Sequence, residues 1–380
     1  MLNKLGLKPV KGVPCVFSSP DLIVFFYVDD IVVLVHPSKL HYKESFQKLL
    51  MSEFDIRSIG EIRWFLGIRV IRDRQVKKLW LLQDSFIDKV VARYDIRTPE
   101  KNPGAPMSDN MLETSHEEPD ETRTRRYNEL IGILAFVACC TRVDVARAHS
   151  VLSRHLIIPG TKHIKVLERV WQYLAYNKYR ALNCSATVNQ REGWNTLRED
   201  TVPTGADAPF LGASDAAFAD DPSTRRSSQG YLFICYGMPV EWKATLQKCF
   251  TKSTTKAELI SLSAMAGEWQ WWDRFIQSLH FNLDAEVSLF CDNQQTVQAV
   301  TTTEERLQTK LKHVDIHSCW LRQEVAHGHV IVKWMPKNMM PADGLTKCLL
   351  KQKHELFLKQ LRMEDVRHLV SKLSISSRLG

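Results

Sequence analysis

The chain has 380 residues, of which 44% are hydrophobic and 25% are charged, and its formal net charge is +8 at pH 7. This is an ordinary globular composition, and the length is enough for two or three domains. The sequence has no run of about 18 apolar residues, so we expect no membrane span. Nine cysteines without a C-x-x-C pair indicate neither a zinc site nor a disulfide framework. Reduced thiols and the lack of an apolar signal core after Met1 favour a cytoplasmic or nuclear protein that is not secreted.

The first stretch with a clear pattern is LIVFFYVDDIVVLVH, in which two apolar runs flank Asp29 and Asp30. The pattern predicts a β-hairpin with the acidic pair at its tight turn. Two neighbouring aspartates repel each other, so a cation is their natural partner. An aspartate pair in an ordinary hairpin turn is the alternative interpretation.

The middle of the chain alternates between polar and helical segments. Residues 97–125 are rich in Pro, Glu, Thr and Asp and have no apolar period, which predicts a disordered or extended surface linker. Residues 126–184 carry long apolar faces at helical spacing. Residues 185–211 are again polar and predict a second linker.

The block from residue 212 to residue 350 has the densest pattern. Its apolar runs predict three strands, a helix, a strand, two helices, a strand and a last short helix, which is a mixed sheet with helices. The strands are expected at 215–219, 230–236, 240–246, 287–291 and 329–335, and the helices after 255, at 294–300, at 312–325 and from 343.

Four acidic residues of this block lie at or near the ends of the predicted elements. They are Asp215, Glu258, Asp292 and Asp343. Converging carboxylates suit hard divalent cations that assist phosphodiester cleavage. Taken singly, Glu258 could belong to a capping box with Thr255, Asp292 and Asp343 could be helix N-caps, and Asp215 could end a polar strand.

Five segments of this block, in this order and at these spacings, resemble ribonuclease H as it is fused to reverse transcriptase in copia-type LTR retrotransposons. The segments are SDAAFADDPSTRRSSQGYLF, STTKAELISLSA, CDNQ, KHVDIHSCWLRQEV and PADGLTK. The resemblance implies an α/β (α+β) fold whose four carboxylates, Asp215, Glu258, Asp292 and Asp343, bind Mg²⁺, with Mn²⁺ as an alternative. It also implies an endoribonuclease that cuts the RNA strand of RNA–DNA hybrids. The loop Trp334–Asn338 lacks the histidine that many such nucleases carry, which suggests slow turnover.

The same resemblance extends toward the N-terminus. Residues 1–96 resemble the end of a reverse transcriptase palm, whose Y-x-D-D hairpin supplies two metal ligands, here Asp29 and Asp30, followed by the start of a thumb. Residues 126–184 resemble the helical connection, with Thr141-Arg142-Val143-Asp144 in place of the usual T-R-P-D. The fingers and the first palm strand, with its third aspartate, are missing. We therefore expect no DNA synthesis by this chain alone, unless other parts of a retroelement polyprotein complete it.

Several polar side chains are candidates for contact with the nucleic acid. Arg225 and Arg226 lie in the turn after the first predicted strand, where a solvated turn is an equally good interpretation. Asn293 and Gln294 follow Asp292 and could meet the minor groove of a hybrid. Lys312 gives its helix a basic surface. A rival hypothesis is a non-catalytic remnant of a decayed or co-opted element, which would bind hybrids without cutting them.

The last segment, residues 351–380, has seven Lys and Arg against three Asp and Glu. Its pattern predicts an amphipathic helix with a basic balance and a polar end. Such a helix could pack on the nuclease block or bind phosphate groups.

Overall fold

The structure is a computed structural model that divides the described chain into two compact units. One unit holds residues 1–63 and 267–284, and the other holds residues 64–266 and 285–380. For residues 312–315 and 374–376 only the backbone is described. The described residues are 2, 6–107, 112–185, 210–283, 286–302 and 312–376.

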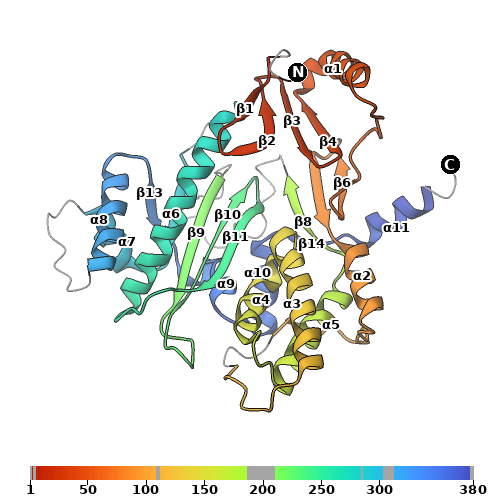
Figure 1. Ribbon diagram of the computed structural model, residues 1–380. Coiled ribbons are helices and arrows are strands. Elements are labelled where there is room, and N and C mark those ends of the chain that lie inside the picture. The colour runs from red at the N-terminus through yellow and green to blue at the C-terminus, as the bar shows by residue number, and fades with distance from the viewer. Residues whose placement is uncertain are drawn as a thin grey trace. The chain divides into compact units, whose positions relative to one another are not determined.

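The smaller unit is built on a four-stranded antiparallel sheet (Figure 1). Helix α1 packs on one face of this sheet through Phe46 and Leu50, which meet Leu22 and Val24. The predicted hairpin is present, because Tyr27 of β3 pairs with the first residue of β4 across a two-residue turn. The elements are β1 (Lys8–Val10), β2 (Val13–Ser18), β3 (Leu22–Tyr27), β4 (Asp30–Val35), a 3₁₀ helix (Pro37–Lys39) and α1 (Leu40–Glu53).

The larger unit contains a mixed five-stranded sheet with the order β11-β10-β9-β12-β13. Strand β10 is antiparallel to both β9 and β11, whereas β12 runs parallel to both β9 and β13. The order of elements along the chain and the mixed α/β class are as predicted. The elements are β9 (Phe210–Ala217), β10 (Ser228–Cys235), β11 (Met238–Leu246), α6 (Thr254–Ser278), β12 (Ser288–Cys291), α7 (Gln294–Thr301), α8 (Lys312–Ala326), β13 (Ile331–Trp334), a 3₁₀ helix (Lys337–Met339) and α9 (Asp343–Thr346). Helix α6 is shared, because its residues from 267 onward belong to the smaller unit.

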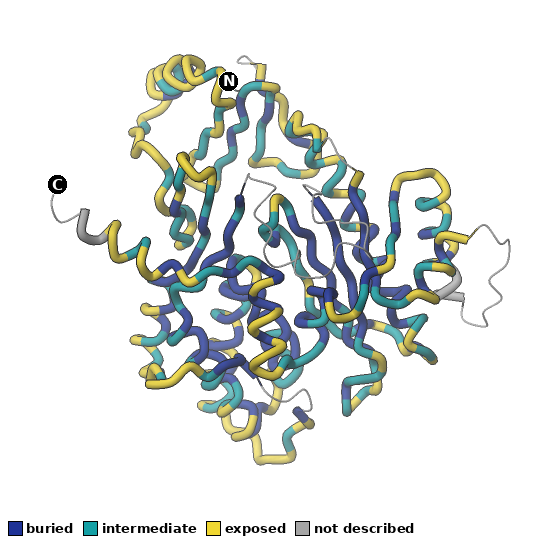
Figure 2. The backbone as a smooth tube through the Cα atoms, turned by 180° about the vertical axis from the view of Figure 1, so that it is seen from behind, coloured by how far each residue is buried: buried dark blue, intermediate teal, exposed yellow. Residues whose placement is uncertain are grey.

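Two glycines show which helix covers which face of this sheet. A Cβ on Gly212 of β9 would meet the side chain of Met265 from α6, so α6 covers that face. A Cβ on Gly230 of β10 would lie 2.6 Å from the Cβ of Leu345, so α9 is seated on the opposite face. The strands between these helices are buried almost throughout, as the dark blue segments of Figure 2 show.

A second sheet of the larger unit joins three distant parts of the sequence. Its order is β14-β8-β7-β6-β5, and all its pairings are antiparallel. Strand β8 lies at the end of the segment that we predicted to be helical, and β14 lies in the predicted tail helix. The strands are β5 (Trp64–Phe65), β6 (Ile68–Asp73), β7 (Lys78–Leu82), β8 (Arg180–Ser185) and β14 (Met363–Asp365).

A helical core lies beside these sheets in the same unit. Its helices are α2 (Asp84–Arg93), α3 (Glu121–Cys140), α4 (Ala146–Leu152) and α5 (Thr161–Tyr176), with 3₁₀ turns at Val143–Val145 and Ser153–His155. The segment 97–125 differs from the predicted linker in two ways. Helix α3 already begins at Glu121, where Asp120 caps it, and Met107 and Leu112 are buried in the helical core. Most of the second predicted linker, residues 186–209, lies outside the described residues.

The segment Thr141–Asp144 is buried and forms a polar cluster. The guanidinium of Arg142 donates to both carboxylate oxygens of Asp144, at 2.9 and 2.7 Å, and neither side chain is exposed. Tyr173 donates its single hydroxyl proton to Asp144 at 2.7 Å. The Nε2 atom of His354, 2.9 Å from the same hydroxyl oxygen, must therefore be the donor of that bond. Burial lowers the pKa of His354 to about 4, so the ring is neutral at pH 7.

His354 belongs to the C-terminal tail, which is not the single helix that we predicted. The tail forms α10 (Lys351–Gln360), strand β14 and α11 (Arg367–Ser376). The helix is interrupted because residues 363–365 pair with β8. Phe357 and Leu358 are buried in the same hydrophobic cluster as Leu232 and Phe290 of the mixed sheet. Of the two open interpretations, packing on the block 212–350 therefore holds for α10, whereas Val366, Leu369 and Val370 pack against the second sheet. No helix in the described ranges is both long and apolar enough to cross a membrane.

We predict that α10 stabilises the mixed sheet. Leu358 is 4% exposed, so Leu358→Ala should lower the free energy of unfolding by about 2–5 kcal/mol, because it leaves a cavity between α10 and the sheet. Leu356, on the same helix but 45% exposed, provides the matched control, and Leu356→Ala should change stability by about 0.5 kcal/mol or less. Urea unfolding of the full chain measures both. Equal effects of the two substitutions would contradict the packing of α10.

Candidate metal centre

The register of two parallel strands places Asp215 and Asp292 side by side. Cys291, the last residue of β12, pairs with Ser214 of β9, so the next residues along the two strands are these two aspartates. Both carboxylates thus stand at the carboxyl end of a parallel strand pair, where α/β sheets commonly bind ligands. Asp215 is 1% exposed, although it is an acid, and therefore belongs to the interior of the site.

The other two acids reach this edge from the helices that cover the sheet. Glu258 comes from the second turn of α6, and its oxygens lie close to those of Asp292. Asp343 is the first residue of α9 and is seated on the opposite face of the sheet. Because Gly230 has no side chain, α9 can approach β10 closely enough to bring Asp343 to Asp215. The four predicted residues therefore gather at one place.

The alternative interpretations, in which each acid only caps a helix or ends a polar strand, are wrong. The N-terminus of α6 is capped by Ser253, whose hydroxyl accepts from a backbone N–H three residues later, so Glu258 is not part of a capping box. Helix α7 is capped by Asn293 and not by Asp292. Asp343 lies inside α9 and makes no cap bond. Asp215 lies in a buried stretch of β9 rather than at a polar strand end.

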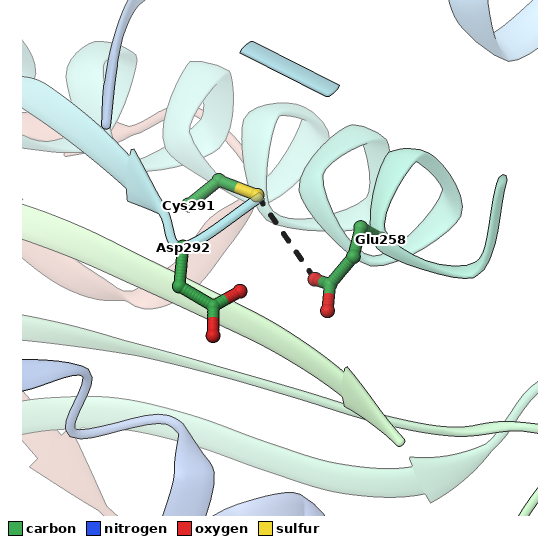
Figure 3. A group of neighbouring side chains, drawn as sticks. All are labelled: Glu258, Cys291 and Asp292. Carbon is green, nitrogen blue, oxygen red and sulfur yellow. Dashed lines mark hydrogen bonds between the residues drawn. The ribbon is translucent and has the colours of Figure 1, made fainter. Parts of the chain in front are cut away.

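The carboxylate oxygens form two overlapping groups. Oxygens of Asp215, Asp292 and Asp343 all lie within 4.8 Å of one another, and so do ligand atoms of Glu258, Cys291 and Asp292. Figure 3 shows the second group, in which Glu258 and Asp292 point toward a common space. The Cys291 thiol also faces Glu258, with its sulfur 4.0 Å from Oε2. Asp292 belongs to both groups and links them.

Crowding of acids in a buried place makes their ionised forms unfavourable. Burial, followed by the charges of Asp215 and Asp292, raises the pKa of Glu258 to about 9. Burial, followed by the charge of Asp215, raises the pKa of Asp292 to about 6. The pKa of Asp343 is raised for the same two reasons. Glu258 is therefore neutral at pH 7 unless additional positive charge compensates the site.

The donor set fits a hard divalent cation. Carboxylate oxygens are the ligands that Mg²⁺ prefers, and Mn²⁺ accepts the same set. Cys291 does not alter this preference, because burial and the charge of Glu258 raise the pKa of its thiol well above the ordinary value. A protonated thiol is a poor ligand for such ions. The residues able to hold the ions are therefore Asp215, Glu258, Asp292 and Asp343.

Two further residues of the site were not singled out from the sequence. Thr346 donates its hydroxyl proton to Oδ2 of Asp215. Lys347 donates to both oxygens of Asp215, at 3.3 and 3.0 Å, and to Oδ1 of Asp343. Both residues lie in the PADGLTK segment that carries Asp343, so their position next to a predicted ligand was the available signal. A lysine and a threonine at a helix end are otherwise common.

The site opens into a pocket of about 460 Å³. Its wall combines acidic, basic and aromatic groups, including Glu258, Asp292, Lys337, Lys347 and Phe218. Phe218 is 40% exposed, so an aromatic face is available beside the carboxylates. Such a wall offers positive charge for a phosphate backbone and an apolar surface for a sugar or base.

The residues predicted to contact nucleic acid differ in their exposure and in their hydrogen bonds. Arg225 is exposed in the turn between β9 and β10, whereas Arg226 is half-buried and donates to the hydroxyl of Thr224. Asn293 lines the pocket, but its side-chain oxygen accepts the cap bond of α7. Gln294 is exposed beside it. Lys312 begins α8, and its side chain lies outside the described part.

Asp29 and Asp30 are exposed at the tip of the β3–β4 hairpin. Within the described ranges, two groups of three ligating side chains lie close enough together to share an ion. Both groups belong to the block 212–350. The hairpin thus presents two carboxylates without a third one from its own unit. Asp21 precedes β3 and lies at the opposite end of that strand.

A family model described as reverse transcriptase (RNA-dependent DNA polymerase) matches residues 2–107. Relatives then extend the similarity over most of the chain. It is 30% identical over 353 residues to the retrovirus-related Pol polyprotein from transposon TNT 1-94 of Nicotiana tabacum, which is 90% of this chain and 25% of the relative.

Two other relatives show the same coverage. The Pol polyprotein from transposon RE1 of Arabidopsis thaliana is 27% identical over 90% of this chain and 21% of its own length. The Ty1-DR6 Gag-Pol polyprotein of Saccharomyces cerevisiae is 21% identical over 92% of this chain and 20% of its own length. The predicted resemblance to copia-type Pol polyproteins is thereby confirmed over nine-tenths of the chain. The chain spans about a quarter of the length of these relatives or less.

Solved structures of two kinds align with the chain. LC11-RNase H1 in complex with an RNA/DNA hybrid is 14% identical and covers 38% of this chain and 97% of its own, with a TM-score of 0.29. The foamy viral protease-reverse transcriptase in complex with an RNA/DNA hybrid is 13% identical and covers 83% of this chain and 36% of its own, with a TM-score of 0.41.

We predict that Asp292→Asn stabilises the protein in the absence of metal. The folded-state pKa of about 6 exceeds the unfolded value of about 4, so the ionised carboxylate costs stability as the pH rises through 6. Two pKa units correspond to about 3 kcal/mol, and solvent screening reduces this, so we expect a gain of about 1 kcal/mol at pH 8.

Urea unfolding in EDTA measures this gain, which should shrink as the pH falls from 6 to 4. Asp95, an exposed carboxylate of the same unit, gives the control substitution Asp95→Asn, which should be neutral. A variant Asp292→Asn that is less stable than the wild type at pH 8 would show that the carboxylates do not repel one another in the folded protein.

Proposed function

We propose that this chain is a Mg²⁺-dependent endoribonuclease that cleaves the RNA strand of RNA–DNA hybrids and is attached to an incomplete RNA-directed DNA polymerase. The observation that carries the proposal is the gathering of Asp215, Glu258, Asp292 and Asp343 at one sheet edge, where the pKa values of Glu258, Asp292 and Asp343 are raised. The similarity to Pol polyproteins over 90% of the chain supports the nucleic-acid substrate. LC11-RNase H1 and the foamy viral protease-reverse transcriptase were each solved in complex with an RNA/DNA hybrid.

In the proposed reaction the four carboxylates would hold the divalent ions. Bound Mg²⁺ would supply activation of the attacking water and neutralisation of charge on the scissile phosphate. Asp215 and Asp292 would set the position of the ions along the strands, while Glu258 and Asp343 would complete the site from α6 and α9. Thr346 orients the Asp215 carboxylate through its hydrogen bond.

The remaining parts of the proposal concern the substrate and the setting. Lys337 and Lys347 on the pocket wall carry charge of the sign that a phosphate backbone requires. Exposed Arg225 and Gln294, together with Arg226, Asn293 and Lys312, are the further proposed contacts. Other parts of a retroelement polyprotein are the proposed protein partners. We place the activity in the cytoplasm or nucleus.

We predict that the full chain cleaves labelled RNA in an RNA–DNA hybrid with Mg²⁺, and that EDTA stops the reaction. Asp292→Asn should reduce the rate at least 100-fold, because it removes a charge shared by both ligand groups. The double variant Asp29→Asn/Asp30→Asn is the matched control and should cleave like the wild type, since these residues lie in the other unit.

The same assay decides between the nuclease and the non-catalytic remnant. Hybrid that is bound but stays intact in both Mg²⁺ and Mn²⁺ would favour the remnant. Cleavage by Asp292→Asn at the wild-type rate would refute the proposed site.

We further predict that the chain alone does not extend a primer on an RNA template. Polymerase chemistry requires ions bridged by carboxylates from two places in the palm. Here Asp29 and Asp30 stand alone at the hairpin tip, and Asp21 is separated from them by the six residues of β3, or roughly 20 Å. Primer extension with dNTPs and Mg²⁺ or Mn²⁺ tests this. Synthesis above that of the Asp29→Asn/Asp30→Asn variant would mean that another acid completes the site.

A further inference from the structure

The ammonium group of Lys347 lies between two of the proposed metal ligands. It donates to Oδ2 of Asp215 at 3.0 Å and to Oδ1 at 3.3 Å, and it also donates to Oδ1 of Asp343. The side chain of Asp215 is 1% exposed, and that of Lys347 is 28% exposed. One organic cation therefore bridges the same pair of carboxylates that a divalent ion would bridge.

This position is determined by the way α9 is held. The backbone N–H of Lys347 bonds to the carbonyl of Asp343 at 2.9 Å, so the lysine is displaced by one helical turn from the aspartate it contacts. Helix α9 has little freedom to move, because Leu345 meets Gly230 on one side and Gly344 meets the ring of Phe357 on the other. A Cβ on Gly344 would lie 2.6 Å from that ring.

The charges of the site explain why such a cation is favourable. In the absence of metal, the carboxylates of Asp215 and Asp343 are close to each other and to Asp292. The ammonium compensates part of this repulsion, and the two aspartates in turn raise the pKa of Lys347, so it remains protonated. A divalent ion at the same pair would meet the ammonium at short range, where repulsion between like charges is strong.

The lysine also has space to move. Its side chain lines the open pocket of about 460 Å³ on whose wall Glu258 and Asp292 lie. Four methylene groups allow the ammonium to leave the carboxylates and enter this pocket while α9 stays in place. No movement of the sheet is required.

We propose that Lys347 is a tethered cation that occupies the Asp215–Asp343 pair when no metal is bound and must leave it when a divalent ion binds there. The inference rests on the proposed function, because it assumes that these carboxylates bind metal. Lys347 therefore weakens metal binding at this pair and stabilises the metal-free protein. It acts on the metal through the two aspartates and is a positioning residue in this respect.

The first test measures Mn²⁺ binding to the full chain by isothermal titration calorimetry without nucleic acid. Lys347→Met keeps the length of the side chain and removes its charge, and should strengthen the weakest binding step at least tenfold. Its melting temperature in EDTA should fall, and Mn²⁺ should restore it. Lys337→Met is the matched control, since Lys337 lines the same pocket and lowers the pKa of Asp292 and Asp343 through its charge. Its affinity should change less than threefold.

The second test uses the wild-type chain, so it does not depend on the folding of a variant. Lysines are acetylated briefly with an N-hydroxysuccinimide ester, and the modification of Lys347 relative to Lys337 is measured by mass spectrometry. Saturating Mg²⁺ should increase this ratio severalfold, because the ammonium leaves its ion pairs.

The outcomes separate the two proposals. Equal Mn²⁺ affinity of Lys347→Met and Lys337→Met, or a labelling ratio that stays constant while metal binds, would overturn the role of Lys347. Absence of Mn²⁺ binding to both the wild type and Lys347→Met would instead overturn the metal site and with it the proposed nuclease. Weaker binding by Lys347→Met would mean that the lysine assists the metal, which also contradicts the proposal.

Discussion

Repulsion between Asp215 of β9 and the carboxylates around it is the constraint on which the arrangement of this site depends. Asp215 and Asp292 are neighbours because β9 and β12 pair in register, and burial together with the charge of Asp215 raises the pKa of Asp292 to about 6. The chain adds two more acids from helices on opposite faces, which increases the cost. A lysine from the end of α9 offsets part of it. The resulting site is costly to fold without metal and well suited to bind one.

Such a site requires rigid support, and the support comes from parts of the chain that are distant in sequence. Helix α9 is seated on β10 at Gly230 and is enclosed by Phe357 of α10. Further support comes from α4, because Arg147 donates to Ser228 of β10 at 2.7 Å and to Asp220 at 2.8 Å. The connection segment, the mixed sheet and the tail therefore share one hydrophobic cluster. The block 212–350 by itself therefore lacks α10 and α4, which hold Asp343 in place.

The buried pair Arg142–Asp144 has a comparable role in the neighbouring core. Both side chains are fully buried, so the loss of either partner would leave an isolated charge in the interior. Tyr173 donates to Asp144, and His354 donates to the Tyr173 hydroxyl oxygen, which brings the tail into this network. Its neutral ring is consistent with a pKa of about 4. The tail is thus attached to the larger unit both through apolar contacts and through a chain of polar ones.

Local sequence patterns determined the elements of the mixed sheet, the β3–β4 hairpin and the identity of the four acids, because strand and helix periodicity and strand-end acids are properties of short windows. Pairing between distant segments is decided by the tertiary structure. The sequence of the tail predicts one amphipathic helix, but strand β14 interrupts it because residues 363–365 pair with the edge of β8. The acid-rich segment before α3 buries Met107 and Leu112, because these side chains pack into the helical core. The position of the Lys347 side chain could not be predicted from local sequence patterns either. Only the fold places its ammonium against an aspartate 132 residues away, because only there do β9 and α9 meet.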